Sequence, residues 1–312
     1  MLFLAGLMGM VLVGASVFVG IDDGLSQDIL DDAGSDEAVE DVPIVPLDQI
    51  IAGGGADEAL SGGDGSDSVG GGGGDDTVSG DAGDDHLYGQ NGDDTVLGGA
   101  DDDVLHGGAG DDLLSGGDGD DHLFGYVGND TMAGDTGDDT LEAGDGADIL
   151  TGSAGDDALH GYLGDDTLTG DEGADVLFGG WGDDLVSGAG DGASDYLNGG
   201  GGDDAIVAGG GDIVTAGDGA DTVYVADWAP EDAAEMLDFD LSEDTLVVLY
   251  NDMAGDAALE LSLEQDTGDA ALTHVLLNGE VVMTLHDAGA LSLADIQLVP
   301  QSAAAVLLQG AA

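Results

Sequence analysis

Residues 62–79 read GGDGSDSVGGGGGDDTVS, which is two consecutive copies of a nine-residue unit, G-G-x-G-x-D-x-U-x, where U is apolar. Nineteen such units follow one another from Gly53 to Tyr224, and most imperfect copies differ by one substitution at a glycine. A fixed period of nine residues over more than half of the chain predicts a repeat architecture in which each unit is one structural element.

The sixth position of the unit is always acidic, and the eighth position is always apolar. The acid is Glu58 in the first unit. In the other units it is an aspartate: Asp67, Asp76, Asp85, Asp94, Asp103, Asp112, Asp121, Asp130, Asp139, Asp148, Asp157, Asp166, Asp175, Asp184, Asp195, Asp204, Asp212 and Asp221. A carboxylate that recurs in phase with glycine turns is a candidate metal ligand at each of these aspartates.

The spacing predicts an all-β fold. Each unit joins a glycine turn to a three-residue x-U-x stretch that alternates as a short strand does. Two units make one coil, and successive coils stack as parallel strands about 4.8 Å apart. The sixth-position carboxylates then form two ladders on opposite edges, one with Asp67, Asp85 and Asp103 and the other with Asp76 and Asp94.

The charge of the chain indicates which ligand completes this fold. The sequence has 69 acidic residues and no lysine or arginine, so the formal net charge is −69. Carboxylates about 5 Å apart repel one another by about 3 kcal/mol at an effective dielectric constant near 20. Calcium accepts carboxylate and backbone carbonyl oxygens together. We therefore predict that several Ca²⁺ ions bind and that the repeat region, with its thin apolar core, folds when they do. The charge excludes nucleic acid as a partner.

Three of the nonapeptides, GGDGSDSVG at 62–70, GGAGDDLLS at 107–115 and GGDGDDHLF at 116–124, resemble the hemolysin-type calcium-binding (RTX) repeats of proteins that Gram-negative bacteria export. Serralysin-type C-terminal domains carry such repeats. The resemblance covers 53–224 and implies a calcium-stabilised parallel β-roll, with Ca²⁺ held between successive turns by the sixth-position aspartates and turn carbonyls. It also implies export through a one-step channel by an uncleaved C-terminal signal, and so an extracellular or secreted location.

Two segments precede the repeats. Residues 1–21 contain no charged side chain and are long enough to cross a membrane of about 30 Å as a helix. Three interpretations stay open for this segment: a membrane anchor that tethers the protein to the cell surface, a cleaved signal, or a hydrophobic cap on the roll. The first two depart from the leaderless export that the repeats imply. Residues 22–52 are rich in acids and predict a solvated linker.

The period stops after the nineteenth unit, and residues 225–300 predict a small β-rich cap that covers the last coil. Residues 273–285 predict a β-hairpin, with Asn278-Gly279 as the two positive-φ residues of a type I′ turn. The Asp-Phe-Asp triplet at 238–240 resembles part of the β-rich caps of some RTX proteins. Residues 301–312 form a tail that is either an export signal or a frayed end.

Three departures from the unit predict irregular coils. Asp101 replaces the fourth glycine of its unit, 188–198 carries two extra residues, and 208–215 lacks one. A replaced turn glycine loses its free access to positive φ, and a change of length disturbs the stacking of identical coils.

The sequence contains no motif of a known catalytic site. No histidine lies in H-E-x-x-H, no serine lies in G-x-S-x-G, cysteine is absent, and without lysine there is no phosphate-binding loop. Paired aspartates such as Asp75-Asp76 recur at every turn, so a structural role explains them better than acid–base catalysis. We therefore predict that the protein is not an enzyme. A degenerate secreted hydrolase, in the cap or in the first fifty residues, is the alternative.

The two sheets of such a roll differ in their outward residues. Even-numbered units place histidines and aromatics on one face: His86, Tyr88, His106, His122, Phe124, His160, Phe178 and Tyr196. The other face carries mostly Thr and Ser, and Leu113 and Ile149 interrupt it, which argues against an ice-binding array. The first face either packs against the cap or binds a surface protein or glycan, with histidines that gain charge below about pH 6.5. A zinc site at His106 and His122 is a third alternative.

Together these features predict a non-catalytic extracellular or cell-surface calcium-binding protein. The main alternative is a self-associating adhesin or surface-layer component, in which calcium drives the assembly of several copies. Light scattering during a calcium titration separates the two, because only the alternative predicts growth in particle size.

Overall fold

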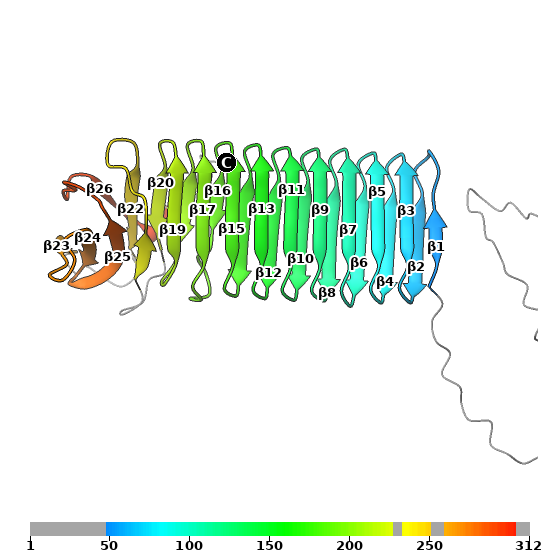
Figure 1. Ribbon diagram of the computed structural model, residues 1–312, viewed down its shortest axis with the longest axis horizontal. Coiled ribbons are helices and arrows are strands. Elements are labelled where there is room, and N and C mark those ends of the chain that lie inside the picture. The colour runs from blue at the N-terminus through cyan, green and yellow to red at the C-terminus, as the bar shows by residue number, and fades with distance from the viewer. Residues whose placement is uncertain (1–47, 227–232, 251–258, 304–312) are drawn as a thin grey trace, which may run out of the picture.

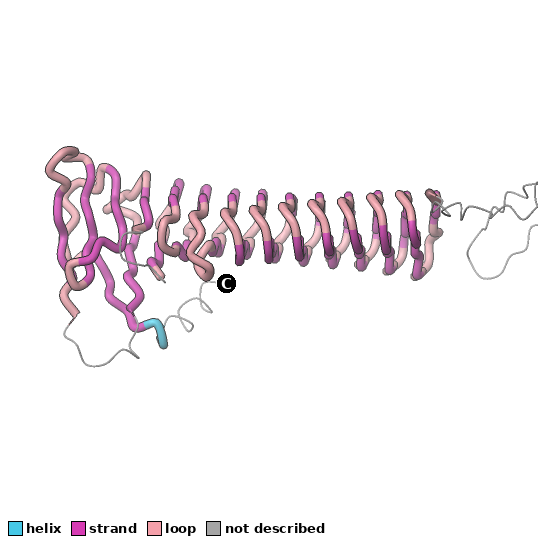
Figure 2. The backbone as a smooth tube through the Cα atoms, turned by 90° about the horizontal axis from the view of Figure 1, so that it is seen from below, coloured by secondary structure: helices cyan, strands magenta, loops and turns pink. Residues whose placement is uncertain are grey.

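Each nine-residue unit forms half of a coil, and each coil contributes one strand to each of two parallel sheets. The computed structural model describes residues 48–226, 233–250 and 259–303. The coils stack into a long roll that ends in a small cap (Figure 1). The view turned by 90° shows the coils following one another with the same pitch (Figure 2). The predicted all-β parallel roll is therefore confirmed.

The sheets contain 14 and 12 strands. The first has the spatial order β1 (Ile50–Ala52), β3 (Ser68–Gly73), β5 (His86–Asn91), β7 (Val104–Ala109), β9 (His122–Val127), β11 (Thr140–Asp145), β13 (Ala158–Leu163), β15 (Val176–Trp181), β17 (Tyr196–Gly201), β19 (Ile213–Asp218), β21 (Ala234–Met236), β25 (Glu280–His286), β24 (Leu272–Leu277) and β23 (Leu261–Gln265). The second has the order β2 (Ala59–Asp64), β4 (Thr77–Ala82), β6 (Thr95–Ala100), β8 (Leu113–Asp118), β10 (Thr131–Thr136), β12 (Ile149–Ala154), β14 (Thr167–Glu172), β16 (Leu185–Ser187), β18 (Ala205–Ala208), β20 (Thr222–Val225), β22 (Thr245–Tyr250) and β26 (Ile296–Pro300).

The strands are longer than the three-residue stretch that the sequence predicts. Most run for six residues, from the seventh position of one unit to the third position of the next, as β8 does. The first glycine of the unit, Gly116 in this case, lies inside the strand. Gly119, at the fourth position, has a φ of 145°, which is accessible almost only to glycine. The tight turn is therefore confined to positions four to six.

Two of the three predicted irregular coils are confirmed. The two-residue insertion shortens β16 to three residues, and the coil that contains the deletion has a four-residue β18. The third prediction is wrong. Asp101 takes up the positive φ of the glycine that it replaces, at 77°, and the strands on either side of it keep six residues.

The space between the sheets holds one row of apolar side chains from each sheet. Leu123, Leu141 and Leu159 lie opposite one another on neighbouring strands of one sheet and are fully buried. Met132 and Leu150 belong to the matching row of the other sheet. Each unit thus adds one large side chain to the core, and the roll has a narrow apolar interior.

The roll starts earlier than the sequence predicts, and its two sheets continue into the cap. Strand β1 pairs with β3, so the roll begins inside the segment 22–52 that the sequence assigns to a linker. At the other end the cap continues both sheets, because β21 pairs with β19 and β22 pairs with β20. The hairpin of β24 and β25 turns at Asn278 and Gly279, both with positive φ, as predicted.

The N-terminal hydrophobic segment 1–21, most of the linker, and residues 304–312 of the tail lie outside the described residues. The alternatives for these segments therefore stay predictions. In the part of the chain that the structure describes, no helix has the length and apolar character needed to cross a membrane.

Candidate calcium site

The sixth-position aspartates form two continuous ladders, one along each edge of the roll. The Oδ1 atom of each accepts a hydrogen bond from the backbone N–H of the residue one coil earlier. Asp103 N donates to Asp121 Oδ1 at 2.7 Å, and Asp121 N donates to Asp139 Oδ1 at 2.7 Å. On the other edge, Asp76 N donates to Asp94 Oδ1 at 2.7 Å. The predicted register is therefore confirmed on both edges.

The second oxygen of these carboxylates has no donor. The aspartates are 0 to 3% exposed. Within the described residues, Oδ2 is buried without a hydrogen-bond partner in Asp67, Asp76, Asp85, Asp94, Asp103, Asp112, Asp121, Asp130, Asp139, Asp148, Asp157, Asp166, Asp175, Asp184, Asp195, Asp204 and Asp221. Asp212 differs, because its unit is one residue short and its Oδ2 accepts the N–H of Gly209 at 2.7 Å. A buried carboxylate oxygen is strongly unfavourable unless a cation or a donor meets it.

The Oδ2 atom and a backbone carbonyl oxygen of the next coil border the same small space. At Gly89, a hypothetical Cβ atom would lie 2.5 Å from Asp94 Oδ2 and 2.8 Å from Gly107 O. Glycine at this position leaves the space between these two oxygens open, because a Cβ atom would enter it. We call such a pair a cradle: the Oδ2 of a sixth-position aspartate and the carbonyl oxygen thirteen residues later. Calcium binds carboxylate and carbonyl oxygens of this kind at about 2.4 Å.

Burial weakens the acidity of the sixth-position aspartates, which we call the inner ladder. It raises the pKa of Asp103 and Asp112 to about 7 and that of Asp121 to about 6, although the N–H donors to their Oδ1 atoms act in the opposite direction. The neighbouring carboxylates of Asp121 and Asp85 raise the pKa of Asp103 further. A cation next to these groups favours the ionised form and lowers their pKa. The ladder is therefore a site whose charge state depends on whether a cation is bound.

Aspartates at the fifth position form a second, outer ladder that the sequence analysis missed. Asp138 N donates to Asp120 Oδ1 at 3.0 Å, and Asp156 N donates to Asp138 Oδ1 at 2.9 Å. Here the later residue donates to the earlier one, which is the opposite sense to the inner ladder. Asn129 takes the same place and accepts the N–H of Ala147 at 2.9 Å. The recurring Asp-Asp pair is the sequence signal of this second ladder, because its first aspartate belongs to the outer ladder and its second to the inner ladder.

The donor set of the cradles fits calcium. It contains only carboxylate and carbonyl oxygens, which hard divalent cations prefer, and it repeats along both edges. Within the described residues no three metal-binding side chains gather at one point. This agrees with the cradle geometry, since each cradle consists of one side-chain carboxylate oxygen and one backbone carbonyl oxygen. Three units carry alanine in place of the first glycine, at Ala143, Ala208 and Ala216.

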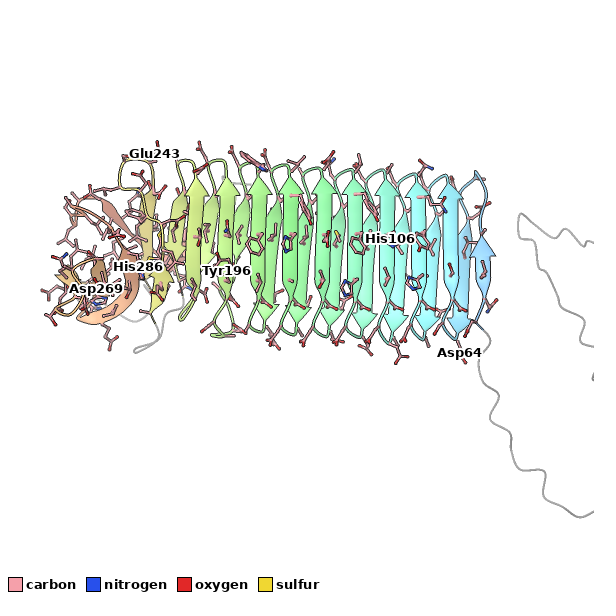
Figure 3. The ribbon with its side chains drawn as sticks, in the orientation of Figure 1. Asp64, His106, Tyr196, Glu243, Asp269 and His286 are labelled. Atoms are coloured by element: carbon pink, nitrogen blue, oxygen red, sulfur yellow. The ribbon has the colours of Figure 1, made fainter. Side chains whose placement is uncertain are left out.

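The predicted aromatic face lies on the outward side of the 14-stranded sheet, and Figure 3 shows His106 and Tyr196 on this face. The ring centroids of Tyr88 and His106 are 4.7 Å apart, and those of His106 and Phe124 are 5.0 Å apart, with interplanar angles of 8° and 13°. Rings that stack at the spacing of the strands stand upright on the sheet. Their flat faces contact one another, so this ladder stabilises the sheet and presents mainly ring edges to solvent.

Positions two and three of the nine-residue unit add exposed side chains that the sequence pattern does not single out, because position two is a glycine position and position three is variable. Tyr126 Oη is 2.9 Å from His106 Nδ1, and Tyr162 Oη donates to Glu142 Oε2 at 3.0 Å. Trp181 is 68% exposed. The described part of the cap lies at the end of the roll and continues its sheets (Figure 2), so this face does not pack against it.

The arrangement of the histidines gives no support to the zinc alternative. His106 lies opposite Phe124, and His122 lies opposite Val104, so the two histidines belong to different columns of the sheet. His106 Nδ1 is already within hydrogen-bond distance of Tyr126 Oη. Among the described residues no group of three or more metal-binding side chains accompanies them.

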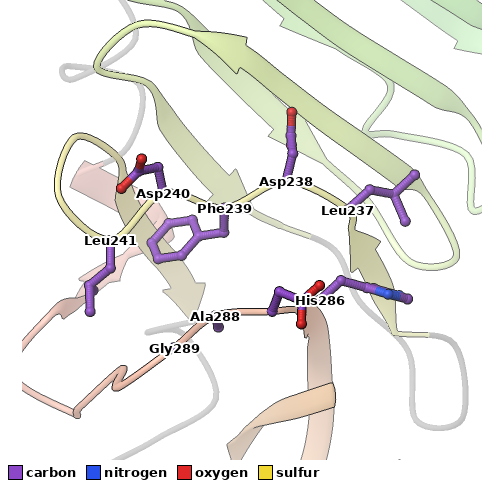
Figure 4. A pocket seen from close by; sticks show the side chains of 9 residues that line it. Leu237, Asp238, Phe239, Asp240, Leu241, His286, Ala288 and Gly289 are labelled. Atoms are coloured by element: carbon purple, nitrogen blue, oxygen red, sulfur yellow. The ribbon is translucent and has the colours of Figure 1, made fainter. Parts of the chain in front are cut away.

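The cap has an open cavity of about 430 Å³ (Figure 4). It is lined by Leu237, Asp238, Phe239, Asp240, Leu241, His286, Asp287, Ala288 and Gly289. Asp238 points toward the roll, where its Oδ1 accepts the N–H of Ala216 at 2.9 Å, and His286 Nε2 is hydrogen-bonded to Glu235. The acid and the histidine thus hold structural bonds with other partners. These bonds give no support to a hydrolase site built on Asp238 and His286.

Comparison with protein families matches the roll to the RTX calcium-binding nonapeptide repeat. The matched segments are residues 70–105, 97–132, 124–159, 133–168, 160–191 and 189–212. They cover most of the roll, and the cap lies outside them. Comparison with curated proteins gives no match. The family match and the oxygen-only cradles agree that Ca²⁺ is the ion that these repeats bind.

Proposed function

We propose that this chain, whose residues 70–212 match the RTX calcium-binding repeat, is a non-catalytic extracellular or cell-surface protein whose repeat region folds when several Ca²⁺ ions bind. The ligands in this proposal are the Oδ2 atoms of the sixth-position aspartates and the carbonyl oxygens that complete their cradles. Calcium, when bound, supplies the positive charge that the chain itself lacks, since it has no lysine or arginine.

The buried carboxylate oxygens without a donor are the observation that carries this proposal. Seventeen aspartates share this feature, and in an unfolded chain the same oxygens would be hydrated. Without a cation, folding buries them unpaired, and the apolar core that opposes this cost has only one row of side chains from each sheet. Ca²⁺ therefore stabilises the folded state selectively, so that its binding free energy becomes folding free energy.

Circular dichroism of the full chain tests the coupling. We expect a strong β spectrum with Ca²⁺ and its loss in excess chelator. Mg²⁺ at the same concentration is the control, and it should restore little of the spectrum because it requires octahedral geometry and keeps its water. A β spectrum that stays unchanged in chelator would contradict the proposal.

The location and the absence of catalysis rest on two supports. RTX repeat proteins are typically exported, and extracellular calcium-binding modules work with Kd values of about 10⁻⁴ to 10⁻³ M. In the described parts of the roll and cap, the sixth-position aspartates serve as rungs of the ladders, and Asp238 and His286 beside the cap cavity are hydrogen-bonded to Ala216 and Glu235. Fractionation of the producing cells, with immunoblots of medium and cell envelope, tests the location. Detection of folded chain in the cytosol alone would contradict it.

We also propose that the exposed strip of Val127, Leu163 and Trp181 contacts a surface protein. These side chains are 54, 50 and 68% exposed and lie in one column of the sheet, where Leu163 is opposite Trp181 and Asp145 separates Leu163 from Val127. A glycan would need flat ring faces, and the stacked ladder beside the strip uses its ring faces internally. The chain contributes only anions, so the complementary partner is a protein with an apolar patch and a basic rim.

Binding of the calcium-loaded chain to intact producing cells tests this surface. Protease treatment of the cells should abolish binding, whereas glycosidase treatment should not. Trp181→Ser should weaken binding at least tenfold, and Ile149→Ser is the matched control, because Ile149 is 50% exposed on the opposite sheet. Binding that survives protease but not glycosidase would favour a glycan and contradict the proposal. Growth in particle size with calcium alone, measured by light scattering, would favour the self-associating adhesin.

A further inference from the structure

The first rung of one carboxylate ladder is not a carboxylate. Gln49 lies at the sixth position of a degenerate unit that precedes Gly53. Its backbone N–H donates to Asp67 Oδ1 at 2.6 Å, just as Asp67 N donates to Asp85 Oδ1 at 2.6 Å one coil later. Its carbonyl oxygen accepts the N–H of Ser68 at 2.9 Å. Gln49 therefore has the backbone position of a ladder aspartate but an amide side chain.

The side chain of Gln49 contacts the atom that completes a cradle. Its Nε2 donates to Gly62 O at 2.6 Å. Gly62 follows Gln49 by thirteen residues, which is the same separation as that of Asp94 and Gly107 in an internal cradle. In the internal cradle a carboxylate oxygen and a carbonyl oxygen border one space and neither can donate. In the first cradle an amide N–H reaches the carbonyl directly.

We infer that Gln49 closes the N-terminal end of this ladder by taking the place of the cation. Its amide N–H₂ satisfies Gly62 O, so the first cradle takes no Ca²⁺, and the row of ions on this edge starts at the cradle of Asp67. The inference rests on the proposed function, because it assumes that the internal cradles hold calcium. It makes Gln49 a residue that sets the number of bound ions and the end of the row.

The other edge of the roll starts differently, which supports a specific role for the amide. Its first rung is Glu58, whose backbone N–H donates to Asp76 Oδ1 at 2.8 Å. The Glu58 carboxylate accepts the N–H of Gly54 at 2.7 Å and borders Gly71 O, the carbonyl of its cradle. That rung keeps an anion next to a carbonyl, as the internal cradles do. Only the Gln49 rung offers a donor, and so the two edges should hold different numbers of ions.

Native mass spectrometry of the calcium-loaded full chain tests the inference, because it counts bound ions one by one. If the wild type binds n ions, Gln49→Glu, of the same size with a carboxylate, should bind n + 1. Gln49→Met, of similar size with neither donor nor charge, should bind n. Asp85→Asn is the sensitivity control and should bind fewer than n. Circular dichroism of each variant in saturating calcium confirms that the roll is folded.

Two results would overturn the inference while leaving the proposed function intact. An unchanged count in Gln49→Glu would show that the first cradle cannot take an ion. A count of n − 1 in Gln49→Met would show that the amide oxygen binds calcium and that Gln49 is a ligand. Failure of the proposed function looks different, because the wild type itself would then bind no row of ions.

Discussion

The roll and the cap are both β structures, but they have different interiors. Each unit of the roll buries one apolar side chain and, in nearly every unit, one carboxylate, such as Leu141 with Asp139. The described strands of the cap bury Val248, Val275 and Met283, and no buried acid occurs there among the described residues. Apolar side chains of the chain itself fill the described interior of the cap. Under the proposed function the roll requires a ligand from solution, so calcium dependence should be a property of the roll.

The largest expected difference in stability between the two regions comes from the turn glycines, which only the roll uses in every coil. Gly119→Ala should cost about 3 kcal/mol, because Gly119 has a φ of 145° and a Cβ would meet the backbone of Asp101. Gly289→Ala in the cap is the matched control, with a φ of 60° and no atom near its Cβ, and should cost about 1 kcal/mol. Urea unfolding at saturating calcium measures both. Equal losses of unfolding free energy in Gly119→Ala and Gly289→Ala would contradict a special need for turn glycines in the roll.

Core truncation should separate the regions by their response to calcium. Leu141→Ala in the roll and Leu285→Ala in the cap should each cost about 2 to 4 kcal/mol, because both side chains are fully buried. Only Leu141→Ala should clearly raise the calcium concentration at which the roll folds, since folding and binding are coupled there. A calcium titration followed by circular dichroism measures the midpoint. The same midpoint shift in both variants would contradict a calcium dependence confined to the roll.

The pH should change the stability of the calcium-free roll in a defined direction. Burial raises the pKa of Asp103 and Asp184 to about 7, against about 3.9 for an unfolded aspartate. The folded state therefore holds these protons more tightly, and the stability that they contribute is full below about pH 4 and is lost as the pH rises to about 7. In calcium-free buffer we expect β structure to increase from about pH 8 to about pH 5.

With calcium the sign reverses, because metal ligands must be deprotonated and protons compete with the ion. Calcium affinity should therefore fall over the same range of pH. Circular dichroism in calcium-free buffer and a calcium titration at each pH measure the two trends. A calcium-free spectrum that does not change between about pH 8 and about pH 5 would argue against raised pKa values in the aspartate ladder.

The smallest effect should come from the outer ladder. Asp138 and Asp139 are neighbours, but Asp138 is exposed and Asp139 is 2% exposed. Asp138→Ala should cost about 0.5 kcal/mol or less and leave the number of bound ions unchanged, because exposed hydrogen bonds contribute little. Asp139→Ala should remove at least one ion and lower stability more. Ion counting and urea unfolding test this pair, and a loss of ions in Asp138→Ala would assign calcium to the outer ladder.

The sequence predicts the roll and its register, because a nine-residue period fixes which residues lie above one another. It does not predict the length of the strands. The first glycine of each unit could belong to the turn or to the strand, and only the structure shows that it is part of the strand. The outer ladder and the role of Gln49 depend on which way each N–H points, and that follows from the backbone and not from the period. Tyr126 stands in place of the second glycine of its unit and Trp181 stands at the variable third position, so their exposure becomes visible only in the folded sheet.

Hydrogen exchange with and without calcium tests the central claim most directly, because it reports on roll and cap in one experiment. In chelator, the amides of roll strands such as β9 and β11 should lose their protection, and those of the cap hairpin β24 and β25 should lose less. Addition of Ca²⁺ should restore protection along the whole roll. Protected roll amides in excess chelator would contradict the account, because they would show that the buried carboxylates need no cation.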